Sequence, residues 1–272
     1  MPMEPNPSFV RQSSEFWALV KGVSESLGYS ARKTKETGHA LKIHHPDEIT
    51  LFAKPFGTSP EVVKKVGEYL EYRANLLNDQ IKPLLMDRAQ AKKALSQLVK
   101  NYKPQCPLPL NKQKGEKRHY AYLTCLVNVL TEKNLKRKTC NYSPRGLCVI
   151  TNQSGQLCKV LSRWMDGAYT DTNNPMAVWE VKEYYGTTTF GSRVADGVYE
   201  TQLDGYEIKE AEKLSGRKIR HYLFIDDRFT WWDCGRSYLC RLIDMMHEGF
   251  VDEIIFGKEV LTRWPEIVKT WK

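Results

Sequence analysis

The chain has 272 residues, of which 41% are hydrophobic and 27% charged, and its formal net charge is +9. Such a chain can bury enough apolar surface for one large or two modest domains, which excludes a disordered tail or a disulfide-stapled miniprotein. It has no apolar run near 18 residues, and residues 1–7 (MPMEPNP) lack the basic start and apolar core of a signal peptide. We therefore expect a cytoplasmic protein that does not contact a membrane.

The seven cysteines do not form a disulfide pattern, because their number is odd and no CxxC pair occurs. We expect reduced thiols that pack as small apolar groups. A zinc site built from Cys140, Cys148 and Cys158 is the alternative.

The positive charge is concentrated in one stretch of the chain. Between Lys82 and Lys138 there are 14 basic and 3 acidic residues, a net charge of +11, whereas the remaining residues carry −2. Clustered Lys and Arg attract polyanions, so nucleic acid is the first partner that this stretch predicts. A solvated basic helix and linker would give the same charge pattern.

The first hundred residues read mostly as helix. A helix is predicted over residues 8–27, followed by two short possible strands, KIHH at 42–45 and EITLFA at 48–53. A second helix should start at Ser59-Pro60-Glu61, because serine caps a helix and proline favours its first position. Residues 80–102 predict a further helix with a basic face.

Residues 103–118 have the composition of a linker, with three prolines, one glycine and five basic residues. We place a domain boundary between residues 115 and 116. Residues 1–115 are then a mainly helical region that could bind DNA or form a dimer, and residues 116–272 are a second domain.

The second domain alternates strands and helices. A helix at 120–133 precedes a hairpin around the turn formed by residues 152–155. The remaining predicted elements are strands at 176–182, 221–226 and 251–256, helices at 193–214 and 239–246, and two short closing helices, the second starting at Pro265. This order predicts an α/β fold with a mixed central sheet flanked by helices.

The strand MAVWEVK carries the candidate chemistry. Its period of two places Glu180 and Lys182 on one face and Trp179 and Val181 on the other. Burying a charged pair is costly, so this placement suggests a functional reason. Antiparallel pairing with the preceding strand would bring Asp166 to the same end of the sheet, so that two carboxylates and one ammonium group converge.

Two carboxylates beside an ammonium group suit metal-dependent hydrolysis of a phosphodiester. Asp166 and Glu180 would bind Mg²⁺, with Mn²⁺ as a substitute, and Lys182 would position or help to deprotonate the attacking water. Asp171 competes with Asp166 as the first metal ligand. In the alternative interpretation, Glu180 and Lys182 form a salt bridge at a sheet edge and Asp166-Gly167 is only a turn.

At this point the sequence resembles the PD-(D/E)XK nucleases, which include many restriction endonucleases and RecB-like exonucleases. The matching residues are Asp166, then Glu180-Val181-Lys182, and a following helix with Gln202 and Tyr206. This last pair looks like the QxxxY element of the RecB-like branch, and its i, i+4 spacing places both side chains on one helical face.

The resemblance covers about residues 120–257 and departs from the family at Met165, where proline is usual. It implies a restriction-endonuclease-like core. It also implies a set of catalytic residues, namely Asp166, Glu180, Lys182, Gln202 and Tyr206.

The leading hypothesis is a Mg²⁺-dependent DNA endonuclease of the restriction or phage-defence type, with double-stranded DNA as its partner. The alternatives are a RecB-like repair or recombination nuclease and a DNA-binding protein without catalytic activity. RNA is an alternative substrate. A two-fold homodimer is the default arrangement for cutting both strands of a palindrome.

Overall fold

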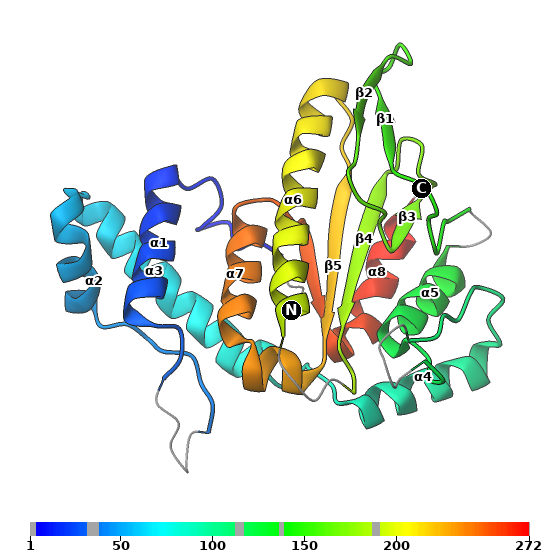
Figure 1. Ribbon diagram of the computed structural model, residues 1–272, viewed down its shortest axis with the longest axis horizontal. Coiled ribbons are helices and arrows are strands. Elements are labelled where there is room, and N and C mark those ends of the chain that lie inside the picture. Colours follow the sequence, from blue (N-terminus) through cyan, green and yellow to red (C-terminus); the bar gives the residue numbers. More distant parts are fainter. Residues whose placement is uncertain (1–3, 32–37, 112–116, 136–138, 187–190, 272) are drawn as a thin grey trace.

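The computed structural model describes residues 4–31, 38–111, 117–135, 139–186 and 191–271 (Figure 1). The domain boundary predicted between residues 115 and 116 lies outside these ranges. The α-helices are α1 (Ser14–Leu27), α2 (Pro46–Ala53), α3 (Pro60–Asn75), α4 (Arg88–Tyr102), α5 (Tyr122–Asn134), α6 (Ser192–Ser215), α7 (Arg236–His247) and α8 (Arg263–Thr270). The short 3₁₀ or π segments are η1 (Lys54–Phe56), η2 (Leu76–Ile81), η3 (Phe229–Cys234) and η4 (Gly257–Leu261). The strands are β1 (Val149–Thr151), β2 (Leu157–Val160), β3 (Gly167–Tyr169), β4 (Ala177–Glu183), β5 (Arg220–Asp226) and β6 (Glu253–Phe256).

A four-stranded sheet in the order β3-β4-β5-β6 forms the centre of the fold. Strand β3 is antiparallel to β4, whereas β4, β5 and β6 are parallel and joined through α6 and α7. Helices α6 and α7 cover one face of the sheet, and α5 and α8 cover the other (Figure 1). The predicted α/β class with a mixed sheet between helices is therefore confirmed.

The predicted hairpin also forms, but it stands apart from the central sheet. Strands β1 and β2 pair antiparallel as a two-stranded sheet of their own. The β4 strand follows the predicted alternation, since Trp179 packs in the core on the α5 and α8 side while Val178 packs with Ile208 and Ala211 of α6.

The N-terminal region differs from the prediction in three places: α1 begins at Ser14, capped by Ser13, rather than at residue 8, and neither predicted strand forms. The segment EITLFA is helical rather than extended, because Pro46 and a capping box between His45 and Glu48 start α2 there. The segment KIHH forms no strand. The start of α3 is confirmed, with the Ser59 hydroxyl accepting the N–H of Val62.

The basic helix is shorter than predicted. The π segment η2 interrupts the chain after α3, and α4 begins only at Arg88, where Asp87 and Gln90 form a second capping box. The exposed lysines Lys92, Lys93 and Lys100 follow on its outer face.

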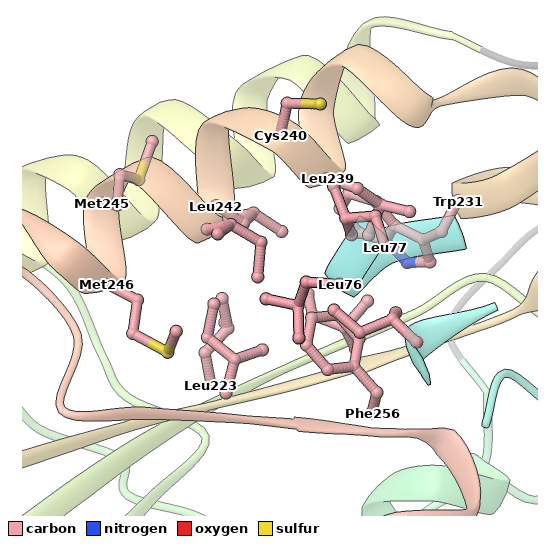
Figure 2. Packing of buried hydrophobic residues seen from close by; sticks show 14 of the residues in the cluster. Leu76, Leu77, Leu223, Trp231, Leu239, Cys240, Leu242, Met245, Met246 and Phe256 are labelled. Atoms are coloured by element: carbon pink, nitrogen blue, oxygen red, sulfur yellow. The ribbon is translucent and has the colours of Figure 1, made fainter. Parts of the chain in front are cut away.

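The core between α7 and the sheet joins both halves of the chain (Figure 2). Leu239, Leu242 and Met246 of α7 lie over Leu223 of β5 and Phe256 of β6. The buried side chains contributed to this cluster by η2 and η3 are Leu76, Leu77, Ile81, Trp231 and Trp232. Both adjacent tryptophans, Trp231 and Trp232, are therefore core residues.

A buried ion pair reinforces the same junction. Arg73 of α3 donates to both carboxylate oxygens of Asp244 in α7, at 2.9 and 2.7 Å, and each residue is 3% exposed. The Tyr69 hydroxyl also donates to Asp244, and Arg73 donates to the Ser24 hydroxyl of α1. The N-terminal helices are thus tied to the sheet domain by a network whose charges are removed from water.

None of the described helices is both long and apolar enough to cross a membrane. All seven cysteines carry free thiols, as expected from their spacing.

Candidate functional site

Glu180 and Lys182 lie side by side on the face of β4 that α6 covers. The Lys182 Nζ is 3.0 Å from Glu180 Oε2 and 2.8 Å from the Oε2 of Glu200, which belongs to α6. Glu180 is 1% exposed and Lys182 is 8% exposed. The period of two therefore predicts correctly both the shared face and the proximity of this pair.

A second cation, Arg163, joins the pair from the loop between β2 and β3. Its Nη1 is 2.7 Å from Asp204 Oδ2, and its Nη2 is 3.1 Å from Glu200 Oε2 and 3.5 Å from Glu180 Oε2. We call Arg163, Glu180, Lys182, Glu200 and Asp204 the charged cluster. Sequence reasoning missed three of its members, although the i, i+4 spacing of Glu200 and Asp204 does place both on one face of α6.

Two oxygens of the charged cluster are buried without compensation. Glu180 Oε1 and Asp204 Oδ1 have no hydrogen-bond partner among the described residues. Burial, followed by the nearby charge of Glu180, raises the pKa of Asp204 to about 7. Burial opposes the charge of Lys182, but Glu180 and Glu200 outweigh it and hold the pKa of Lys182 well above its usual range.

Asp166 lies against the backbone of β4. Its Oδ2 accepts the N–H of Val181 at 2.8 Å, and its own N–H donates to the carbonyl of Trp179 at 3.1 Å. Burial raises the pKa of Glu183, whose side chain occupies the β4 face opposite Glu180, to about 8, and the charges of Asp226 and Asp166 add to this rise. Asp171, the competing candidate, is exposed and accepts a hydrogen bond from Asn141.

Gln202 and Tyr206 do not join the charged cluster. Gln202 lines a separate cavity of about 240 Å³ between α6, α7 and α1, and the Tyr206 ring packs against Phe250 with 4.3 Å between centroids. The reason is helical geometry, since each residue advances the helix by about 100°. Residues 202 and 206 are therefore on the opposite side of α6 from Glu200 and Asp204. This geometry gives no support to the catalytic role that the resemblance implies for Gln202 and Tyr206.

The donor chemistry of the charged cluster fits Mg²⁺ or Mn²⁺. Within the described ranges no group of three or more His, Cys, Asp or Glu side chains is arranged to hold a metal. Mg²⁺, however, is commonly held by only one or two carboxylates together with substrate phosphates and water. The unpartnered oxygens of Glu180 and Asp204 are hard ligands of that kind.

The basic helix lies at the edge of the sheet where β4 and β5 end. Figure 1 shows α4 at this end of the sheet. The N–H of Met86, just before α4, donates to Asp226 Oδ1 at the end of β5, at 2.8 Å. Asp226 is 0% exposed, and burial raises its pKa to about 7. Ligands of α/β sheets commonly bind outside the carboxyl ends of parallel strands.

The raised pKa of Asp226 predicts a loss of stability as the pH rises. Between the ordinary pKa of 3.8 and about 7, the folded protein keeps a proton on Asp226 that the unfolded chain has lost, so its free energy of unfolding falls with increasing pH. We expect Asp226→Asn to reduce the difference in this free energy between pH 4.5 and pH 8, measured by urea denaturation. The exposed Asp196→Asn is the control and should leave that difference unchanged. An equal difference in Asp226→Asn and the wild type would contradict the prediction.

No curated protein and no solved structure matches this chain. Two family models do match it, and both are described as domains of unknown function. Residues 3–80 match DUF7690, and residues 86–271 match DUF7687. The first match ends at residue 80 and the second begins at residue 86, just before α4, so that helix falls in the same match as the sheet. Because the second match covers more than half of the chain, the protein belongs to the DUF7687 family.

Proposed function

We propose that this protein is a divalent-metal-dependent nuclease that hydrolyses phosphodiester bonds of DNA at the charged cluster. The observation that carries the proposal is the buried Glu180–Lys182 pair, in which one carboxylate oxygen has no hydrogen-bond partner among the described residues. A buried polar atom without a partner costs about 1–3 kcal/mol. Groups held at such a cost, with perturbed pKa values nearby, concentrate at functional sites.

Glu180 and Asp204 would hold the metal ion. When bound, such an ion neutralises the scissile phosphate and lowers the pKa of an attacking water. We favour Asp204 over Asp166 as the partner of Glu180, because Asp204 Oδ1 is unpartnered among the described residues whereas Asp166 already accepts the N–H of Val181.

The two cations of the cluster suit the binding of phosphate. Lys182 keeps its proton, since its pKa is raised, and it therefore donates to a phosphate oxygen or to the water rather than acting as a base. Arg163 has a planar guanidinium group with several donors, which matches the geometry of a phosphate. When substrate binds, Lys182 and Arg163 would each replace one of their carboxylate partners by a phosphate oxygen of the substrate.

DNA is the proposed substrate because of the basic segment. Its helix α4 lies at the edge where β4 ends, so exposed lysines could follow the backbone of a duplex toward the cluster. The same lysines favour a second candidate, a DNA-binding protein without catalytic activity. The positions of Gln202 and Tyr206 lend no support to the RecB-like branch.

Nicking of supercoiled plasmid tests the proposal and the choice of ligands together. With Mg²⁺ we expect the wild type and Asp166→Asn to produce open circles at rates within about tenfold, and Asp204→Asn to be about a hundredfold slower, because it loses a metal ligand. EDTA should stop the reaction.

Three other outcomes of this assay have defined meanings. Binding that falls steeply with salt, without nicking in Mg²⁺ or Mn²⁺, would favour the non-catalytic candidate. Degradation of linear DNA without nicking of the circular plasmid would favour an exonuclease. A slower rate in Asp166→Asn than in Asp204→Asn would reverse the ligand assignment.

A further inference from the structure

The loop between β2 and β3 is anchored at both ends, by apolar contacts of Leu161 and Met165 and by polar contacts of Ser162. Leu161 and Met165 are buried, with exposures of 1% and 2%. Ser162 donates to the carboxylate of Glu207 in α6 through both its N–H, at 2.8 Å, and its hydroxyl, at 2.5 Å. The backbone of this loop is therefore fixed against α6 and the sheet.

The same loop reaches the charged cluster through Arg163 and carries a large exposed aromatic residue at the next position. Arg163 makes three of the five ion pairs within the cluster, and Asp166 binds the backbone of β4. Trp164, the residue after Arg163, is 57% exposed. A ring on a fixed backbone loses little conformational entropy when a flat partner covers it.

We propose that Trp164 stacks on an unpaired nucleobase next to the phosphate that the charged cluster engages. This inference rests on the proposed function and gives its substrate class, namely DNA with a single-stranded or extruded base near the cut. Every base presents a flat π-face, so stacking on an aromatic ring tolerates any sequence, and a neighbouring arginine can hold the backbone phosphate. A base inside a duplex already has both faces covered by its neighbours, and therefore has to leave the stack before it reaches Trp164.

Fluorescence and affinity measurements on the full chain in EDTA test this inference without cleavage. Of the other tryptophans, five are at most 7% exposed and Trp271 stacks on Tyr169, so Trp164 should dominate the change in emission when a ligand binds. We expect an oligothymidylate to quench the emission. Trp164→Ala should weaken binding of the same oligonucleotide, labelled for anisotropy, by roughly 5- to 150-fold.

Three controls decide whether the effect is stacking. Trp164→Phe should keep the affinity within a few fold, and Leu157→Ala, which alters another exposed apolar residue, should leave it unchanged. An oligonucleotide of abasic sites should bind the wild type and Trp164→Ala equally.

The inference is overturned by unchanged affinity in Trp164→Ala, by an equal loss on the abasic oligonucleotide, or by a Trp164→Phe variant as weak as Trp164→Ala. Base-dependent binding without plasmid nicking would keep the stacking role and remove hydrolysis. Plasmid nicking by the wild type together with unaltered binding by Trp164→Ala would keep hydrolysis and remove the stacking role.

Discussion

Glu180→Gln is expected to lower the rate of plasmid nicking in Mg²⁺ by about a thousandfold while the affinity for DNA stays within a few fold. A metal ion stabilises the transition state of phosphodiester hydrolysis by several kcal/mol, and each 1.36 kcal/mol is a factor of ten in rate. Glutamine has the shape of glutamate but a much weaker affinity for a divalent ion. The exposed lysines of α4 do not contact Glu180, so the electrostatic part of binding should persist.

A matched variant separates chemistry from folding in this experiment. Glu253 on β6 is also buried, at 4% exposure, and pairs with Arg263 at 2.6 Å, away from the charged cluster. Glu253→Gln should therefore carry a comparable cost in stability but nick plasmid at nearly the wild-type rate. Nicking that survives in Glu180→Gln, or that falls equally in both variants, would remove Glu180 from the proposed site.

Arg73→Leu is expected to lower the free energy of unfolding by about 3–5 kcal/mol. The substitution leaves Asp244 buried without its cation, and an uncompensated buried charge is far more costly than the loss of a surface ion pair. Urea denaturation of the wild type and the variant measures the effect. Lys65→Ala, which breaks the exposed pair with Glu68, should cost no more than about 1 kcal/mol.

The double variant Arg73→Leu/Asp244→Leu tests whether the unpaired charge of Asp244 causes the loss of stability in Arg73→Leu. Removing both charges replaces the ion pair by apolar groups, which is often neutral or stabilising. We therefore expect the double variant to regain much of the stability lost in Arg73→Leu. Additive losses would show that packing, rather than the unpaired charge, accounts for the cost.

The fold could be predicted where local patterns decide the structure. The alternation in β4 and the Ser59-Pro60 start of α3 each depend on neighbouring residues, and both are confirmed. The strand predicted at residues 48–53 was wrong because its alternating apolar residues also suit a short helix, and the His45–Glu48 capping box decides for the helix.

Only part of the candidate site could be predicted, because only part of it depends on a local sequence pattern. Glu180 and Lys182 follow from the period of one strand. Arg163 and Asp204 come from a loop and a helix whose positions relative to β4 depend on tertiary packing. The resemblance pointed to Gln202 and Tyr206 of α6, whereas the structure brings Glu200 and Asp204 to the cluster. One sequence does not indicate which side of a helix meets the sheet.

Binding of Mn²⁺, followed by the electron paramagnetic resonance signal of the free ion, tests the claim that the charged cluster holds a divalent metal. The wild type and Glu253→Gln should each bind the ion at one site, and Glu180→Gln should release it. Absence of binding in the wild type, or a bound ion that Glu180→Gln retains, would contradict the assignment of this cluster as a metal-dependent catalytic centre.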